Sequence, residues 1–165
     1  MLRKLSPSVA EGNVHEGAGA GPASILVQRR IEWWDTDASG YYHNTAVSRL
    51  LETAETLLLD RLGFLHDVYH RLPRVRLEMD FLRPLGFHDL VEAELRVSAV
   101  GNTSATYEME IRRDGEPCSR LRAVVALLDR AGGRSVPWPA AYRRQLLTAG
   151  RQPPEMLVTG DETSA

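Results

Sequence analysis

The chain has 165 residues, which is enough for one domain with a substantial core. Hydrophobic residues make up 43% and charged residues 25%, as in ordinary globular proteins. The formal net charge of −2 argues against a protein that binds nucleic acid or a membrane surface mainly by electrostatic attraction.

Cysteine usage and hydropathy indicate the compartment. The single cysteine, Cys118, excludes an internal disulfide framework and is typical of a reducing compartment. No apolar run approaches the roughly 18 residues that a membrane span needs. No apolar block follows Arg3 and Lys4, as it would in a secretory signal. We therefore expect a cytoplasmic protein.

Composition divides the chain into three parts. Residues 1–23 are rich in Gly, Ala, Ser and Pro and lack periodicity, which predicts a disordered leader. Residues 149–165 are similar and predict a flexible tail. The expected domain therefore covers residues 24–148, and it contains no internal repeat.

The domain begins with a strand, a turn and a long helix. In ILVQRRIEWW (25–34), apolar residues share one parity that is broken at Arg29, which predicts a strand with one buried face. After the turn, apolar residues recur at intervals of three and four: Val47, Leu50, Leu51, Ala54, Leu57, Leu58 and Leu62. They predict a helix over 45–62, about 27 Å long, that ends near Gly63.

Four segments of alternating polarity follow, at 75–81, 91–99, 105–112 and 121–128. Turn signals separate or end the last three: Gly101-Asn102, Asp114-Gly115 and Gly132-Gly133. This order predicts an antiparallel meander with one covered face. The strand over 121–128 is apolar on both parities, which fits burial on both faces. A short helix is expected at 139–148.

The fold class that results is α+β. The helix over 45–62 is the one long helix available to cover the sheet, so we expect a curled antiparallel sheet wrapped around one central helix. This description matches the hotdog fold. Its sheet has exposed edges and an uncovered face, so we expect a homodimer or a homotetramer.

Three segments resemble the 4-hydroxybenzoyl-CoA thioesterase family, a family of hotdog-fold acyl-CoA thioesterases. DTDASG (35–40) is similar to the family's Asp-x-Asp-x-x-Gly turn after the first strand. LEMDFLRPLGFHDLVEAE (77–94) is similar to its second strand, Arg-Pro turn and Asp-led third strand. VVALLDRAGGRSVPWP (124–139) is similar to its last long strand and proline-flanked exit. The resemblance covers about residues 28–140.

The resemblance implies the hydrolysis of a thioester of CoA or of an acyl-carrier protein to a free acid, without a cofactor or metal. It implies that Asp37 acts as nucleophile or general base. It also implies that a backbone N–H near His43 or Asn44 polarises the thioester carbonyl. The sequence departs from the family after Gly40, and Val47 stands where many members have a tyrosine.

The residues of the turn support this chemistry without the family. The first turn of a helix has unpaired N–H groups and the positive end of the dipole, and Asp37 lies just before it. Gly40 lets the backbone fold back tightly, so a carboxylate and N–H donors can face one carbonyl. We expect Gly40 and Tyr42 to contact the substrate. Tyr42, with Trp34 and Tyr41, could also desolvate Asp37 and raise its pKa.

Each polar neighbour has a second interpretation. We expect Asp35 to make an Asx-type hydrogen bond within the turn rather than to act in catalysis. His43 either donates to the carbonyl or tunes Asp37, or it is a polar residue outside the helix. Asn44 is expected at the helix N-cap, a position that also places the oxyanion donor.

Other candidate residues carry weaker signals. Of the helical glutamates Glu52 and Glu55, Glu52 is expected to reach the site more readily, although a solvated or interface position is favoured for both. His66 and His70 are four residues apart but lack a third ligand, which indicates a surface pair rather than a metal site. Arginines should bind the CoA phosphates, and the candidates are Arg74, Arg76, Arg83, Arg112, Arg113, Arg120, Arg122 and Arg134.

Two other functions fit the same fold. A hotdog hydratase or dehydratase would need a histidine paired with a carboxylate, which Asp37 and His43 could form. A non-catalytic module would bind an acyl group without turnover. The three matching segments favour hydrolysis.

Overall fold

The computed structural model describes residues 21–152 and 155–156, so the predicted leader up to residue 20 and most of the predicted tail lie outside the described residues. The elements, in chain order, are β1 (Ser24–Arg30), η1 (Trp33–Asp35), α1 (Asn44–Arg61), α2 (Leu65–Val68), η2 (Tyr69–Arg71), β2 (Arg74–Phe81), β3 (Leu90–Val100), β4 (Ser104–Arg113), β5 (Glu116–Ala126), α3 (Ala140–Thr148) and β6 (Glu155–Met156).

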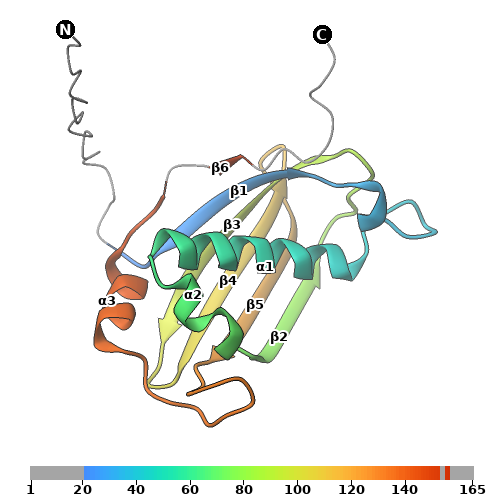
Figure 1. Cartoon of the computed structure of the whole chain (residues 1–165). Coiled ribbons are helices and arrows are strands. Elements are labelled where there is room, and N and C mark those ends of the chain that lie inside the picture. Colours follow the sequence, from blue (N-terminus) through green and yellow to red (C-terminus); the bar gives the residue numbers. More distant parts are fainter. Residues whose placement is uncertain (1–20, 153–154, 157–165) are drawn as a thin grey trace, which may run out of the picture.

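The described strands form a single sheet in the order β2-β5-β4-β3-β1-β6. All pairs are antiparallel except the short β1–β6 pair. The sheet curls around α1, which crosses its concave face (Figure 1). This arrangement confirms the predicted α+β hotdog architecture. The first strand stops at Arg30 rather than at residue 34, because residues 33–35 form a 3₁₀ turn.

The β4–β5 hairpin turns at the predicted Asp114-Gly115 pair. These residues have φ values of 52° and 79°, as the two central residues of a type I′ turn require. Gly63, with φ 79°, follows the end of α1, and its N–H donates to the carbonyl of Asp60. In the described residues, no helix is long and apolar enough to cross a membrane.

The core lies between α1 and the concave face of the sheet. The buried face of α1 consists of Ala46, Val47, Leu50, Leu51, Ala54, Leu58 and Leu59. The predicted stripe is therefore correct, except that Leu57 is only partly buried. The second parity of β5 is also only partly buried, at Val124 and Ala126, because the opposite face of the sheet is open to solvent.

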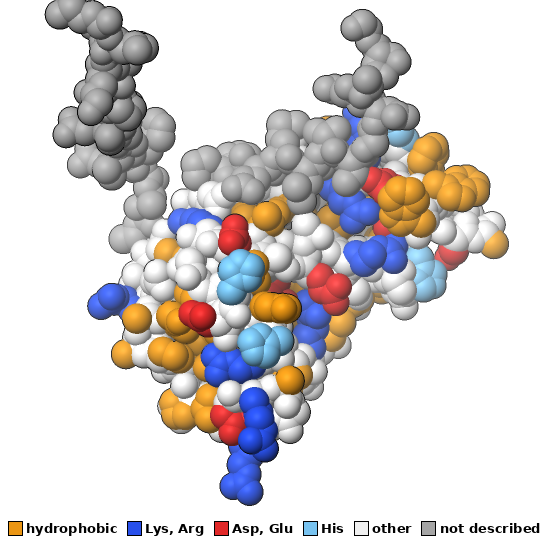
Figure 2. Space-filling view, in the orientation of Figure 1, with side chains coloured by type: hydrophobic (Ala, Val, Ile, Leu, Met, Phe, Trp, Pro, Cys, Tyr) orange, Lys and Arg blue, Asp and Glu red, His pale blue; other side chains and the backbone are white. Residues whose placement is uncertain are grey.

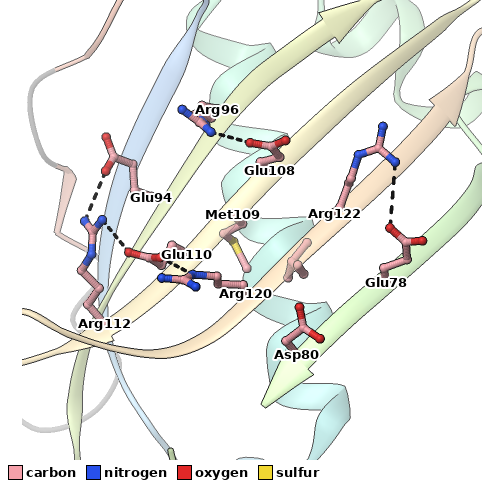
Figure 3. A pocket seen from close by; sticks show the side chains of 11 residues that line it. Glu78, Asp80, Glu94, Arg96, Glu108, Met109, Glu110, Arg112, Arg120 and Arg122 are labelled. Carbon is pink, nitrogen blue, oxygen red and sulfur yellow. Dashed lines mark hydrogen bonds and ion pairs between the residues drawn. The ribbon is translucent and has the colours of Figure 1, made fainter. Parts of the chain in front are cut away.

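That opposite face carries cross-strand ion pairs (Figure 3). Figure 3 shows α1 behind the strands, with Arg96 of β3 beside Glu108 of β4 and Arg120 of β5 beside Glu110 of β4. The charged atoms of these two pairs are 2.5 and 2.6 Å apart. The same residues line a shallow hollow of about 510 Å³. Exposed pairs of this kind stabilise a fold by about 0–1 kcal/mol each, so this face contributes solubility more than stability.

A buried carboxylate joins β1, η1 and α1. Asp35 is 1% exposed, and its Oδ2 accepts hydrogen bonds from Arg29 Nη2 at 2.8 Å and from the Glu32 N–H at 2.9 Å. Its Oδ1 accepts from Arg49 Nη2 on α1 at 2.6 Å, and its backbone carbonyl accepts from the His43 N–H at 2.6 Å. We call this cluster the Asp35 clasp.

The predicted role of Asp35 was therefore wrong. Asp35 makes no Asx-type bond along the turn, because its side chain points back into the protein toward two arginines. A pattern of local turn residues gives no sign of partners 6 and 14 residues away.

A second cluster joins α1 to the edge of the sheet. Glu55 is mostly buried and pairs with Arg74 at 2.7 Å, near the buried hydroxyl of Tyr107. Burial raises the pKa of Glu55 from its ordinary 4.5 to about 6, Arg74 opposes that rise and Glu52 adds to it. The side chain of Glu52 is 62% exposed. Of the two glutamates, Glu55 and not Glu52 therefore reaches the interior.

The Asp35 clasp makes a prediction about stability. Asp35→Asn leaves Arg29 buried without a counter-charge, so we expect the free energy of unfolding in urea to fall by about 3–5 kcal/mol. Asp60→Asn, an exposed carboxylate on the same helix, should change it by less than about 0.5 kcal/mol. An Asp35→Asn protein as stable as wild type would contradict the role given to the clasp.

Glu55 predicts a pH dependence of stability. Its pKa is higher in the folded state than in the unfolded chain, so its favourable contribution is complete below about pH 4.5 and is lost as pH rises through about 6. The difference amounts to about 2 kcal/mol. Glu55→Gln removes this titration. Between pH 4 and pH 7, its free energy of unfolding in urea should therefore rise by about 2 kcal/mol relative to that of wild type. Glu52→Gln should largely keep the wild-type dependence, and a Glu55→Gln protein that tracks wild type at both pH values would refute this assignment.

Candidate active site

The turn between η1 and α1 is a tight loop closed by backbone hydrogen bonds. Thr36 and Tyr42 form a β-bridge, and the Asp37 N–H donates to the carbonyl of Tyr41 at 3.0 Å. The Gly40 N–H donates to the carbonyl of Asp37 at 2.9 Å. Gly40 has φ 79°, and a Cβ there would meet no atom within 4 Å. A glycine is therefore favoured by the backbone conformation and not by crowding.

Asp37 lies on the exposed side of this loop. Its Oδ1 accepts hydrogen bonds from the Ser39 N–H at 2.8 Å and from Ser39 Oγ at 2.5 Å. This is the Asx-type arrangement that was expected of Asp35. Among the described residues both bonds go to Oδ1, which leaves Oδ2 for another partner.

The two hydrogen bonds also decide the charge of Asp37. The Ser39 hydroxyl first, and then its backbone N–H, hold the pKa of Asp37 below its ordinary value of 3.8. The aromatic neighbours were expected to raise this pKa by desolvation, but the loop is open to water and burial has the smaller effect. Asp37 is therefore ionised at neutral pH.

The helix N-cap is His43, one residue before the predicted Asn44. His43 has extended backbone angles, and its Nδ1 accepts from the Thr45 N–H at 3.2 Å. In that arrangement the ring proton is on Nε2. Asn44 is the first residue of the helix, because the backbone already becomes helical there.

The first turn of α1 leaves one open donor. The His43 N–H is bonded to the carbonyl of Asp35, the Thr45 N–H to His43 Nδ1, and the Ala46 N–H to the carbonyl of His43. Of these four consecutive N–H groups, the Asn44 N–H has no acceptor within the described part of the chain. It lies at the positive end of the α1 dipole.

Tyr42 lies two residues before this donor, and its side chain contacts two strands of the sheet. Its hydroxyl donates to the carbonyl of Cys118 at 3.2 Å, and its ring lies 5.8 Å from the ring of Phe81. Burial raises the pKa of Tyr42. Tyr42 therefore connects the start of α1 to β5 and to the end of β2.

Beyond Tyr42 the molecule presents an apolar edge. Val75, Leu77 and Phe81 of β2 are 62%, 40% and 51% exposed, although they share the parity that faces the core in other strands. β2 is the outermost strand on this side of the sheet (Figure 1). α1 does not cover these side chains, and one edge of β2 has no neighbouring strand among the described residues.

The remaining candidates do not converge on this turn. His66 belongs to α2 and His70 to η2, both are exposed, and the described residues contain no cluster suited to a metal ion. Of the eight candidate arginines, all but Arg134 have a carboxylate partner: Arg74, Arg76, Arg83, Arg112, Arg113, Arg120 and Arg122. Sequence reasoning missed the hydrogen bonds that Ser39 donates to Asp37, although its position two residues after Asp37 is the usual signal of an Asx turn.

Comparison with known proteins identifies the family. Residues 39–119 match the family model described as Thioesterase superfamily. The matched segment contains all of α1, strands β2 to β4 and the start of β5, and it begins two residues after Asp37. No curated protein matches the chain by sequence.

Several solved structures share the fold. A predicted thioesterase from Bacillus stearothermophilus is 25% identical, with a TM-score of 0.68 over 75% of this chain and 94% of that one. A thioesterase from Thermus thermophilus, complexed with coenzyme A and zinc, is 25% identical, with a TM-score of 0.68 over 74% and 90%. A 1,4-dihydroxy-2-naphthoyl-CoA thioesterase from Synechocystis, 15% identical, has a TM-score of 0.66 over 74% and 95%.

The family match and these structures confirm the resemblance that the three sequence segments predicted. Residues 39–119 belong to the thioesterase superfamily, and the chain shares the hotdog fold of these thioesterase structures.

Proposed function

We propose that this protein hydrolyses an acyl-CoA thioester to a free acid and CoA, with Asp37 as the catalytic carboxylate. The observation that carries the proposal is the pairing of an ionised carboxylate with an open N–H donor at the two ends of one short turn, at Asp37 and Asn44. Membership of the thioesterase superfamily and a CoA-bound relative of the same fold support the choice of reaction.

The Asn44 N–H is the proposed oxyanion donor. A thioester carbonyl develops negative charge when it is attacked, and a donor aimed at that oxygen stabilises the transition state. The neighbouring N–H groups of His43, Thr45 and Ala46 already have acceptors. The α1 dipole adds positive potential at the same point. His43 contributes by capping the helix and so orienting this donor.

Asp37 supplies the attacking group in one of two ways. As a general base, it takes a proton from water while the water oxygen attacks the carbonyl carbon, and the C–S bond then breaks to release the CoA thiolate. As a nucleophile, Oδ2 attacks the carbonyl carbon and expels the thiolate, and water then hydrolyses the mixed anhydride. Both routes require the ionised carboxylate, which the bonds from Ser39 favour.

Gly40 and Tyr42 are proposed to contact the substrate. Gly40 brings the backbone close to the thioester, and the Tyr42 ring, with Phe81, offers an apolar surface for the acyl group. The hydratase alternative is less favoured, because the Nδ1 of His43 is engaged by the helix and the ring does not pair with Asp37.

The first prediction of this proposal concerns Asp37. We expect Asp37→Asn to lower kcat by about 10²-fold or more, because the base or nucleophile is lost. Free-thiol release from a panel of aromatic and fatty acyl-CoAs measures this, and the best substrate identifies the acyl class. Asp114→Asn, in an exposed turn, is the matched control and should keep full activity.

Ser39→Ala provides a sharper test of the same carboxylate. It removes the largest cause that lowers the pKa of Asp37, so the acidic limb of the kcat/KM profile should move to higher pH while activity at neutral pH is largely kept.

A folded Asp37→Asn protein with wild-type thiol release would place the site elsewhere.

We further propose that the protein is a homodimer joined along β2. Of the apolar side chains exposed on this edge strand, Phe81 lies beside Tyr42, so a second copy that covered the edge would close the site on that side. Two antiparallel β2 strands would extend the sheet across the two-fold axis.

Sedimentation at micromolar concentration tests the assembly and separates a dimer from a tetramer. Leu77→Glu should shift the protein toward the monomer and lower its activity, because a charge would be buried at the interface. Leu90→Glu, equally exposed at 42% but on β3, should stay dimeric. A wild-type protein that sediments as a monomer would refute the assembly.

A further inference from the structure

A group of exposed aromatic side chains flanks the proposed site. Trp33, Trp34, Tyr41 and Phe87 are 74%, 67%, 52% and 56% exposed. We call these four residues the aromatic rim. Figure 2 shows hydrophobic side chains gathered with basic ones at the end of the molecule where the turn before α1 projects. Two of these rings, Trp33 and Phe87, contact each other, and an exposed apolar patch is a common mark of an interaction site.

The rim is held in place by backbone bonds. The Ile31 N–H donates to the carbonyl of Asp89 at 2.8 Å, and the His88 N–H donates to the carbonyl of Ile31 at 2.7 Å. These bonds hold the loop between β2 and β3 against the end of β1. The ring of Phe87 consequently meets the ring of Trp33 edge to face, with centroids 6.1 Å apart. The aromatic surfaces are therefore preorganised.

A basic group adjoins the aromatic rings. Arg30 Nη1 donates to the carbonyl of His88 at 3.2 Å, and the His88 ring lies 5.7 Å from that of Phe87. His88 has φ 72°, a left-handed conformation that is uncommon outside glycine and often found at functional sites. In the described residues Arg30 has no carboxylate within ion-pair distance, unlike seven of the eight arginines considered above.

The rim is adjacent to the catalytic turn. Tyr41 forms a β-bridge with Gly86, the residue before Phe87. The carbonyl of Tyr41 accepts from the Asp37 N–H at 3.0 Å. A ligand that reaches from Asp37 to Phe87 would thus cross two paired backbone segments.

We propose that the aromatic rim binds the adenine nucleotide of CoA, with the base stacked on Trp33 or Phe87 and a phosphate group at Arg30 and His88. The purine base of the nucleotide has a π-face for stacking, and the nucleotide's phosphates match the Arg30 guanidinium, which has no carboxylate partner among the described residues. A pantetheine arm attached to a carrier protein has no base to place there. This inference rests on the proposed function and selects CoA over a carrier protein as the substrate's carrier.

Two substrates with the same acyl group distinguish a loss of nucleotide binding from a loss of the chemical step. They are the acyl-CoA and the acyl-pantetheine, which lacks the nucleotide. Trp33→Ala and Phe87→Ala should each raise KM for the acyl-CoA by about 5- to 100-fold, the range for the loss of one base–aromatic stack. The kcat should change little, and both constants for the acyl-pantetheine should be unchanged. Arg30→Gln should also raise KM for the acyl-CoA alone.

Tyr69→Ala is the matched control. Tyr69 is 64% exposed but belongs to η2, outside the rim, so its loss should leave both substrates unaffected. Thermal unfolding of each variant checks that the fold is kept. A KM change of equal size for both substrates, or no change for either, would overturn the proposal.

Calorimetric titration with CoA and with pantetheine tests the subsite without turnover. Wild type should bind CoA more tightly than pantetheine, and Trp33→Ala should abolish the difference. If wild type hydrolyses neither thioester, the hydrolase proposal fails. The titration still tests whether the aromatic rim binds the nucleotide, because it does not depend on turnover. Equal binding of CoA and pantetheine by wild type, or faster hydrolysis of an acyl-carrier protein than of the acyl-CoA, would refute the nucleotide subsite.

Discussion

The buried carboxylate of Asp35 is the contact on which the geometry of this protein's turn depends. It lies between Arg29 at the end of β1 and Arg49 on the second turn of α1. A carboxylate at 1% exposure would be strongly unfavourable alone, so its two arginine partners and one backbone N–H have to be in place together. This requirement fixes where α1 begins relative to the sheet.

The same contact decides which backbone groups are open. The carbonyl of Asp35 accepts a hydrogen bond from the His43 N–H, and Nδ1 of the His43 ring accepts one from the Thr45 N–H. Within the described part of the chain, the Asn44 N–H is thereby left without an acceptor at the positive end of the helix. An oxyanion donor must be unpaired and rigid in the free protein, and this network makes it both. The carboxylate of Asp37 is held in an analogous way, because Ser39 occupies one of its oxygens and keeps it ionised.

The exposed surfaces around the turn differ in chemistry. On one side, β2 presents aliphatic and phenyl side chains along an edge that no other described strand pairs with, which suits a second copy of the chain. On the other, the aromatic rim presents flat rings beside Arg30, which suits a planar, charged ligand. The convex face of the sheet carries neither, since its arginines are matched by carboxylates. Each surface thus fits one part of the proposed function: the β2 edge fits the proposed dimer, and the aromatic rim fits the proposed nucleotide subsite.

Local patterns in the sequence were sufficient for the architecture. Alternation over β2 to β5, the helical stripe of α1 and the Asp114-Gly115 turn all depend on neighbouring residues, and they predicted the elements to within a few positions. The DTDASG segment likewise indicated the turn before α1 and the proposed catalytic residue Asp37, because its signal is contained in six residues. Tertiary structure decided the roles of the residues around them. Asp35 became a buried anchor through Arg29 and Arg49, His43 replaced Asn44 as the N-cap, and Glu55 rather than Glu52 reached the interior. Those outcomes depend on partners that are distant along the chain and on how far each carboxylate is desolvated by burial. Neighbouring residues in the sequence determine neither.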